Sequence, residues 1–378
     1  SNSMENKEKS KVYFTDFRAK PGYNLLQKLE RLIKVAGIEK IDFQNKFVAI
    51  KIHFGEPGNL AYLRPNYSKV VADTVKSLGG KPFLTDCNTL YVGGRKNALD
   101  HIDAAYLNGF TPFSTGCNVI IADGLKGTDE EYVEINKEYI KTAKIGKAIM
   151  DADVIISLNH FKGHEGTGFG GAIKNIGMGC GSRAGKMEMH SAGKPNVLEN
   201  KCKKCRMCIK ICAHGAISYN DLGIAQIDHN KCVGCGRCIG ICNFDAIKSP
   251  NDESADILNK KMAEYAYAVV KDKSQFHISL ICDVSPNCDC HAENDAPIVP
   301  NIGMLASFDM VALDKACADL VNNQKPFENS ALGEKIKKHI DEKDNFHINH
   351  PETNWESQIE HGEKIGLGTS NYELIKII

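Results

Sequence analysis

The sequence predicts an α/β protein whose body is built on a mostly parallel β-sheet and is interrupted by a smaller α+β segment. Three observations support this. Apolar runs typical of strands alternate with amphipathic helical stretches over the first 195 residues. The same alternation resumes after Pro250. Between the two parts, eight of the chain's 15 cysteines lie from Cys202 to Cys242.

The first part contains the clearest strand signals. Helical stretches separate them, among them leucines from Leu25 onward that end at Gly37, and Val70 to Leu78, which ends at Gly79. Strands joined by helices imply βαβ units and parallel pairing. The expected strands are 47–54, 81–86, 118–123 and 153–161.

The second part repeats the pattern. We expect a helix at 254–271, a strand at 276–284, a helix capped by Ser307, and a helix opened by the capping box Thr353–Glu356. With Met4 as the expected natural start, the predicted organisation is 4–195 for the first part of the body, 196–250 for the insert and 251–378 for the second part.

Composition excludes several classes of protein. The 47 Lys and Arg balance the 47 Asp and Glu, so we expect neither nucleic acid nor an anionic membrane as a partner. No apolar run reaches the roughly 18–20 residues of a membrane helix, and residues 1–11 are polar, unlike a secretory signal. An odd number of cysteines cannot pair fully. We therefore expect a cytoplasmic protein with reduced thiols.

The insert carries an internal duplication. Residues 202–217 (CKKCRMCIKICAHGAI) and 232–247 (CVGCGRCIGICNFDAI) place every cysteine at an offset of 30, in the pattern C-x₂-C-x₂-C-x₃-C. Three thiolates of each run hold one iron–sulfur core and the fourth crosses to the other core. Two 4Fe–4S clusters follow, one on Cys202, Cys205, Cys208 and Cys242, the other on Cys232, Cys235, Cys238 and Cys212.

Over about fifty residues this insert resembles a bacterial two-cluster ferredoxin. It departs from that family in carrying Ala213 and Asn243 where proline usually follows the fourth cysteine. Zinc is the alternative metal, because C-x₂-C pairs also form tetrahedral sites. The lysines and Arg206 around the first run would raise that cluster's potential or dock an acidic redox partner protein; a solvated basic face is the alternative.

Polar residues follow the expected strands of the body. Because parallel strands bring their carboxyl ends to one sheet edge, where ligands bind, we expect a cleft there. Any one of these residues could instead be a helix cap or turn residue. The candidates for substrate binding are His53, Asp86 and Asp123.

The stretch 159–179 is the richest in functional side chains. His160, Lys162 and His164 are the catalytic candidates, able to bind or protonate a small or anionic substrate. The glycines that follow do not fit a dinucleotide fingerprint, since no strand-ending acid comes about 20 residues later. We expect instead an anion-binding loop that enters a helix near Ala172, with Lys174 adding charge; a flexible glycine-rich linker is the alternative.

A second group of possible metal ligands follows the strand at 276–284. Cys282, Cys288, Cys290 and His291 could bind zinc or an extra iron, although adjacent ligands are geometrically awkward. A redox-active or substrate-facing thiol is the alternative.

The body resembles the family named domain of unknown function 362, many of whose members also carry ferredoxin-type clusters. Its layout is also similar to that of nickel-dependent lactate racemase, from which no residue is transferred. The segments that carry the family resemblance are KIHFGEPGN (51–59), NHFKGH (159–164), AIKNIGMG (172–179), ASFDMVALDKACADL (306–320) and GLGTSNYEL (366–374).

These observations predict an iron–sulfur electron-transfer protein, an oxidoreductase that passes electrons from two clusters to a substrate in the cleft. Two alternatives stay open. One is a non-enzymatic electron carrier or maturation factor that binds a partner protein. The other is a non-redox enzyme whose clusters are structural or sense oxygen.

Overall fold

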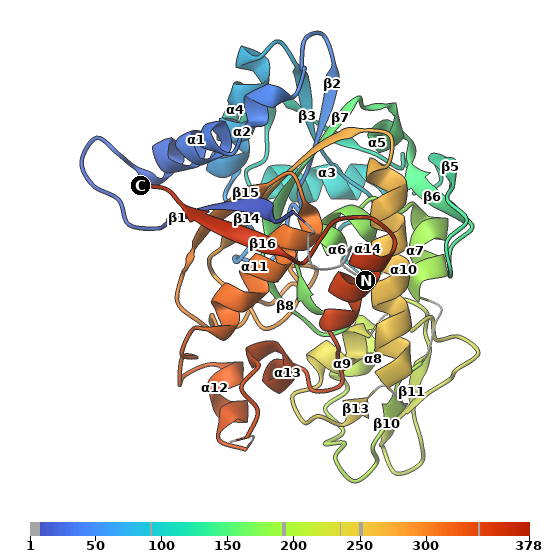
Figure 1. Cartoon of the computed structure of the whole chain (residues 1–378). Helices are drawn as coiled ribbons and strands as arrows, with labels where there is room; N and C mark the ends of the chain where they lie inside the picture. Colours follow the sequence, from blue (N-terminus) through green and yellow to red (C-terminus); the bar gives the residue numbers. More distant parts are fainter. Residues whose placement is uncertain (1–7, 91–92, 191–193, 235, 249–251, 339–340) are drawn as a thin grey trace, which may run out of the picture.

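The computed structural model describes residues 8–90, 93–190, 194–234, 236–248, 252–338 and 341–378. Its largest element is an eight-stranded sheet with the order β16-β1-β15-β14-β7-β2-β3-β4 (Figure 1). In chain order these strands are β1 (Ser10–Asp16), β2 (Phe47–Lys51), β3 (Lys81–Asp86), β4 (Asn118–Ile121), β7 (Val154–His160), β14 (Ser274–Ile281), β15 (Gly303–Ser307) and β16 (Tyr372–Lys376).

Strand direction confirms the predicted mixed α/β fold with a mostly parallel sheet. Neighbours from β14 through β7, β2 and β3 to β4 pair in parallel. Within this sheet only β15 runs the other way, antiparallel to both β14 and β1. All five strands expected from apolar runs are present, whereas β1, β15 and β16 extend the sheet beyond them.

Helices cover both faces of the sheet, which is why its central strands read as continuous apolar runs. All seven residues of β7 are buried. Leu29, Val71 and Ala105 join alternate strand residues in one core, while Ile173, Met262 and Val311 join the others in the second core. The first face is covered by α1 (Leu25–Val35), α2 (Pro65–Ser77) and α3 (Ala98–Leu107), and the second by α6 (Ala172–Gly177), α10 (Asp252–Val270), α11 (Met310–Asn322) and α14 (Glu356–Lys364).

Smaller elements complete the body. They are η1 (Ile38–Lys40), α4 (Pro112–Thr115), β5 (Glu130–Glu134), β6 (Thr142–Gly146), α5 (Lys147–Asp151), β8 (Lys162–His164), β9 (Gly168–Gly170), α7 (Arg183–His190), α12 (Ala331–Ile336) and α13 (Asn345–Asn349). Strands β8 and β9 form a hairpin directly after β7. This buried hairpin takes the place of the solvated turn or linker that residues 162–170 could otherwise have formed.

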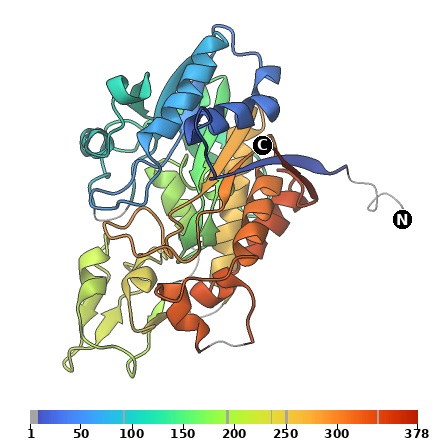
Figure 2. The same ribbon diagram turned by 90° about the vertical axis from the view of Figure 1, so that its left-hand side faces the viewer.

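Residues 196–248, apart from Cys235, lie in the lower part of the molecule in Figures 1 and 2. Strand β10 (Asn196–Val197) pairs with β13 (Ile247–Lys248), so the two ends of the segment meet. Between them lie α8 (Met207–Ile211), α9 (Arg237–Ile241) and the pair β11 (Ile217–Tyr219) and β12 (Ala225–Ile227). A separate small core with Cys208 and Cys238 holds the segment together. The division at 195/196 and 250/251 stays a prediction, and the second boundary lies outside the described residues.

Two helix starts differ from the sequence-based expectation. Asp309, not Ser307, caps α11, since its carboxylate accepts from the Val311 and Ala312 amides. The Ser307 hydroxyl instead accepts from Asp309 N, directly ahead of the helix. Helix α14 begins at Glu356 after Trp355, which makes no side-chain cap. The Thr353 hydroxyl donates to His350 O and Glu356 pairs with His347, so these two residues do not form a capping box.

The start of α6 is also different in kind. Its first amides, Ala172 N and Ile173 N, donate at 2.7 and 2.9 Å to the carboxylate of Asp314 on α11. Burial raises the pKa of Asp314 to about 7 although these amides favour its charged form. The expected anion-binding loop at Ala172 is therefore wrong, because a side chain of this chain already occupies that place.

We expect Asp314→Ala to lower the free energy of unfolding by about 2 kcal/mol, since two buried amides lose their acceptor. Urea unfolding followed by far-ultraviolet circular dichroism measures the change. Asp73→Ala is the control, because Asp73 pairs with Lys69 on the exposed face of α2 and should cost less than about 0.5 kcal/mol. Equal effects of the two substitutions would contradict this role of Asp314.

Candidate functional site

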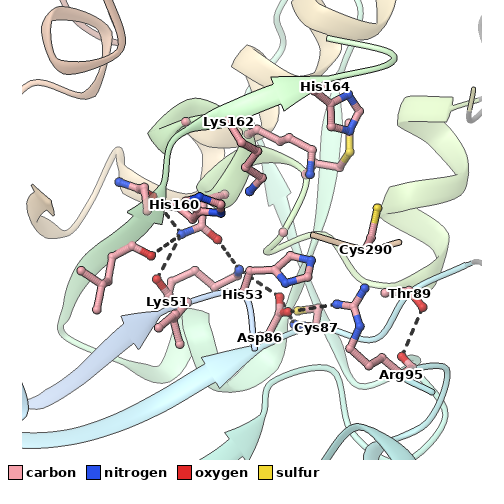
Figure 3. A pocket seen from close by; sticks show the side chains of 18 of the residues that line it. Lys51, His53, Asp86, Cys87, Thr89, Arg95, His160, Lys162, His164 and Cys290 are labelled. Atoms are coloured by element: carbon pink, nitrogen blue, oxygen red, sulfur yellow. Dashed lines mark hydrogen bonds and ion pairs between the residues drawn. The ribbon is translucent and has the colours of Figure 1, made fainter. Parts of the chain in front are cut away.

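A cavity lies at the carboxyl ends of the parallel strands (Figure 3). It leaves about 60 Å³ for the centres of water-sized molecules, which corresponds to roughly four to six waters. Seven residues expected at the site line it, namely His53, Asp86, His160, Lys162, His164, Lys174 and Cys290. The structure therefore brings together strand ends that are far apart in sequence, as expected at the edge of a parallel sheet.

The floor of the cavity is a buried polar network. The Lys51 ammonium, 1% exposed, lies 2.9 Å from Asp86 Oδ1 and donates to Asn175 Oδ1 at 2.6 Å. Asn175 Nδ2 in turn donates to Lys51 O and Asn159 Oδ1. Burial opposes the charge on Asp86, yet Lys51 and His101 hold the pKa of Asp86 well below its usual value. These bonds join β2, β3, β7 and α6.

A second buried ion pair forms the wall beside Asp86. Arg95 Nε donates to Glu56 Oε2 at 2.7 Å, and Arg95 Nη1 lies 3.8 Å from Asp86 Oδ2. Burial disfavours the charge on Arg95, but Glu56 and Asp86 outweigh it and raise the pKa of Arg95. Arg95 is thus fixed between two carboxylates at the edge of the cavity.

His160 is fully engaged by protein atoms. Its Nδ1 lies 2.7 Å from Asp289 Oδ2 and its Nε2 lies 2.7 Å from Cys282 O. Because each ring nitrogen already faces an acceptor of the protein, neither nitrogen is left to bind a ligand. We therefore assign His160 to positioning Asp289 and the loop after β14, in place of the expected proton transfer.

Lys162 has the opposite character. Its Nζ lies 3.9 Å from Asp289 Oδ2, beyond hydrogen-bond distance, and Figure 3 shows the side chain pointing into the cavity. Five cationic side chains line the cavity (Lys51, Arg95, Lys162, Lys174 and Lys186) against the two carboxylates of Asp86 and Glu165. This balance favours an anionic ligand.

His53 and His164 are held in the same way, and both lie near the Cys288 thiol. His53 Nδ1 accepts from Gly55 N, and His164 Nδ1 accepts from the Gly166 and Thr167 amides. Each ring therefore carries its proton on Nε2, and both side chains help to lower the pKa of the nearby Cys288 thiol. Burial lowers the pKa of His53 to about 4, which keeps its ring neutral.

Cys288 lies among donors. Its Sγ is 3.5 Å from Lys174 Nζ. The hydrogen bond from Cys290, followed by the charge of Lys174, lowers the pKa of Cys288 well below its usual value even though burial opposes this. The same contact raises the pKa of Cys290, which stays protonated.

Glu165 and His291 form a buried ion pair behind these thiols. His291 Nε2 lies 2.5 Å from Glu165 Oε1, and Glu165 Oε2 accepts from Cys288 N at 3.2 Å. Burial disfavours both charges, but each partner outweighs it: His291 lowers the pKa of Glu165, and Glu165 raises the pKa of His291 to about 10.

The structure separates some of the candidate residues. Asp123 lies off the cavity, where its Oδ1 accepts from Asn88 N and Nδ2 and burial raises its pKa to about 6. Cys282 packs in the core that α1, α2 and α3 cover. Among the described residues, the buried group with metal-ligand spacing is Glu165, Cys290 and His291, without Cys282 or Cys288.

The cysteines of the 196–248 segment also gather. Cys202, Cys205, Cys208 and Cys242 line one cavity together with apolar residues such as Val197 and Ile247. In the other set, Cys212 lies close enough to influence Cys232 electrostatically. Cys235 lies outside the described residues.

The segment abuts the strand-end cavity. Arg237, on α9 beside Cys238, donates from Nη2 to Cys290 O at 2.9 Å. Gly236 lies close to Gly166, in the loop after His164. The two cysteine-rich regions of the chain are thus in direct contact.

The family model for a domain of unknown function, DUF362, matches residues 48–319. The chain belongs to the DUF362 family. Its match covers the strands and loops that build the strand-end cavity. None of the helices of this DUF362 protein in the described part of the chain has the length and apolar character needed to cross a membrane. No curated protein matches the chain.

Two solved structures are similar at low identity. The lactate racemase apoprotein from Thermoanaerobacterium thermosaccharolyticum is 11% identical, with a TM-score of 0.40 over 82% of this chain and 57% of its own. A protein from Thermotoga maritima is also 11% identical, with a TM-score of 0.40 over 77% of this chain and 57% of its own. The DUF362 chain thus spans less than two thirds of either neighbour.

Several residues that line or support the cavity were not predicted. Lys51, Arg95, Glu165 and Asn175 line it, and Asp289 supports it through His160. Glu165 follows His164 directly, and Asp289 stands between two cysteines, so adjacency to the candidates was the available signal. No signal in the sequence marked Lys51, because an isolated lysine at the end of an apolar strand is usually exposed.

We expect Glu165→Gln to lower the free energy of unfolding by about 3 kcal/mol at about pH 6, because it leaves the buried His291 with only the more distant and exposed Glu293 as counter-charge. The His291 pKa is raised to about 10, so this stabilisation is complete below its usual pKa and disappears as pH rises through the raised value. The difference between wild type and variant should therefore shrink between about pH 6 and pH 10. Urea unfolding at both ends of that range measures it.

Glu356→Gln is the matched control. It breaks a half-exposed Glu–His pair, with 2.8 Å between His347 Nε2 and Glu356 Oε2, and should cost about 1 kcal/mol or less. A wild-type-to-Glu165→Gln difference that is constant with pH would show that the buried pair is not ionised.

Proposed function

We propose that this DUF362 protein is an iron–sulfur electron-transfer protein, an oxidoreductase that exchanges electrons between two 4Fe–4S clusters and a small anionic substrate in the strand-end cavity. The observation that carries the proposal is the arrangement of its cysteines. Two C-x₂-C-x₂-C-x₃-C runs lie in tandem, and the fourth cysteine of the second run lies with the first three of the first run.

The backbone of both runs supports a common function. Lys204 and Arg206 adopt left-handed conformations with φ of 60° and 67°, and Gly234 and Gly236, offset by 30 residues, adopt the same region at 76° and 78°. Such conformations are costly for Lys and Arg and free for glycine. A sharply folded loop that recurs at this cost is typical of one that wraps three thiolates around a bound group.

The surroundings of the first four-cysteine set suit a cluster that exchanges electrons with a partner. Cys205 is exposed, and the basic Lys203, Lys204 and Arg206 surround it. Positive charge favours the more negative, reduced cluster. The same residues would attract an acidic redox partner protein.

When bound, the clusters would supply or accept single electrons. The chain's own residues do the rest at the cavity. Lys162 and the other cations bind an anion, while the Lys51–Asp86–Asn175 network fixes the floor on which it lies. His53 and His164 hold protons on Nε2 within the site, and the limited volume excludes bulk water, which strengthens these charge interactions.

The contact between α9 and the Cys290 loop favours this proposal over a carrier that only binds partner proteins. A carrier needs no internal cavity next to its clusters, whereas Arg237 ties the second cysteine run to the wall of such a cavity. The strand-end cations would then serve the same electron-transfer reaction.

The first test is cluster content. After anaerobic purification we expect about eight iron and eight acid-labile sulfide per chain. Cys212→Ala should remove the second cluster and leave the paramagnetic resonance signal of the Cys202, Cys205, Cys208 and Cys242 cluster. Cys117→Ala, a buried cysteine of the body, is the control and should change neither signal. Stoichiometric zinc without sulfide, or selective loss of the first cluster in Cys212→Ala, would overturn the cluster assignment.

The second test concerns the anion. Lys162→Met should weaken binding of small carboxylates or inorganic phosphate about 10- to 100-fold in calorimetry, because a buried charge-assisted hydrogen bond is lost. Lys69→Met on the exposed face of α2 is the control and should bind as wild type. If Lys162→Met matches wild type at unchanged cluster content, the cavity is not the substrate site.

A further inference from the structure

The turn from Cys288 to His291 brings the Cys290 main chain against the Cys288 sulfur beside the cavity. His291 N donates to Cys288 O at 3.2 Å, and Cys290 N donates to Cys288 Sγ at 3.4 Å. The Cys290 thiol also acts on the Cys288 thiol, whose pKa it lowers. In a β-turn the first and third Cα atoms lie within the roughly 4.4–6.8 Å that a disulfide requires. This geometry lets the two sulfurs approach without moving the main chain far.

The surrounding donors stabilise one thiol as its anion. His53, His164 and Lys174 all act on Cys288, from the loop after β2, the β8–β9 hairpin and α6. Lys174 and His164 also lie near the charge of Glu165. A thiolate next to a thiol is the arrangement from which a disulfide forms and into which it is reduced.

A metal ion is a poorer occupant of these sulfurs. A histidine that binds metal through Nε2 must carry its proton on Nδ1, but Nδ1 of His53 and Nδ1 of His164 both face backbone N–H donors. Glu165 and His291 already satisfy each other at 2.5 Å. Arg237 adds a further positive charge beside Cys290.

We propose that Cys288 and Cys290 are a redox-active dithiol that exchanges electron pairs with the iron–sulfur clusters. This inference rests on the proposed function. In the oxidation, Cys288 S⁻ and Cys290 S–H form one S–S bond, release the Cys290 proton and give up two electrons, one to each of two oxidised clusters. The reverse step consumes two electrons and one proton and restores the thiolate and the thiol.

The path between the two regions is short. Arg237 stands next to Cys238 in the second cysteine run and bonds the carbonyl of Cys290 itself. Cys290 also lines the cavity. The pair therefore lies between the centre that handles single electrons and the place where a substrate reacts, and it converts two single-electron steps into one two-electron step.

The test uses the holoprotein under anaerobic conditions. It is equilibrated with mixtures of dithiothreitol and its cyclic disulfide, quenched in acid and alkylated, and the peptide with Cys282, Cys288 and Cys290 is analysed by mass spectrometry. We expect a species lighter by two hydrogen atoms in which Cys288 and Cys290 are linked and Cys282 is still alkylated. The species should be absent from Cys288→Ser and Cys290→Ser and present in Cys282→Ala.

Paramagnetic resonance of the same samples tests the coupling. The protein is first reduced with dithionite and freed of excess reductant, and the cyclic disulfide of dithiothreitol is then added. Two reduced clusters should become oxidised for each disulfide that is reduced, and Cys290→Ser should keep the resonance signal of its reduced clusters. If iron and sulfide are present but both thiols can still be alkylated at every ratio of dithiothreitol to its disulfide, this inference is wrong and the proposed function stands. If the disulfide forms but no clusters are found, the proposed function is wrong. Protection of Cys290 by a stoichiometric extra zinc would also overturn the dithiol.

Discussion

The ammonium of Lys51 holds together the elements on which the site depends. It is buried on β2 between Asp86 at the end of β3 and Asn175 of α6, and Asn175 continues the network to β7. A buried charge without partners would cost several kcal/mol, so β2, β3 and α6 can pack closely only if these groups meet. Because the network fixes the strand ends relative to α6, it also fixes Lys174 beside Cys288 and so sets the geometry of the thiol site.

Asp289 has a comparable function on the other side of the cavity. It stands between the two cysteines of the turn, and its Oδ2 lies 2.7 Å from His160 Nδ1 at the end of β7. Burial disfavours its charge, yet His160 and Lys162 outweigh this and lower its pKa. The turn is thus attached to the central strand by Asp289 and to the cysteine-rich segment by Arg237. Neither attachment requires the side chains of the thiols, which leaves the sulfurs available for chemistry.

Much of the fold could be predicted because its central strands are buried on both faces and therefore read as apolar runs. The same reasoning placed His53, Asp86, His160, Lys162 and His164 at one edge. It could not find β1, β15 and β16, whose direction and order depend on long-range pairing. Nor could it separate Asp123, which binds the Asn88 loop, from the residues of the cavity, since both kinds of residue follow a strand in the same way.

The remaining differences concern helix caps and the side to which one cysteine points. Asp314 caps a helix start that the sequence assigns to a ligand, and it is more than a hundred residues away in the chain. Asp309, directly before α11, caps that helix in place of the more distant Ser307, and Cys282 packs in the core opposite to that of its neighbour Ile281 because successive side chains alternate between the faces of the sheet. Local spacing determines which residues are available for a cap or a site; packing of the two helical layers determines which are used.

If Cys288 and Cys290 form the proposed dithiol, charge couples their redox state to the binding of an anion in the cavity. The reduced pair carries a thiolate at Cys288 beneath Lys174, and disulfide formation removes that negative charge from a cavity lined mainly by cations. An anion in the cavity therefore interacts more favourably with the disulfide state, in which Lys174 has lost its counter-charge. By linkage, the bound anion favours the disulfide to the same extent. Binding of the substrate would thus shift the electron pair out of the sulfurs, and its release would restore the thiolate.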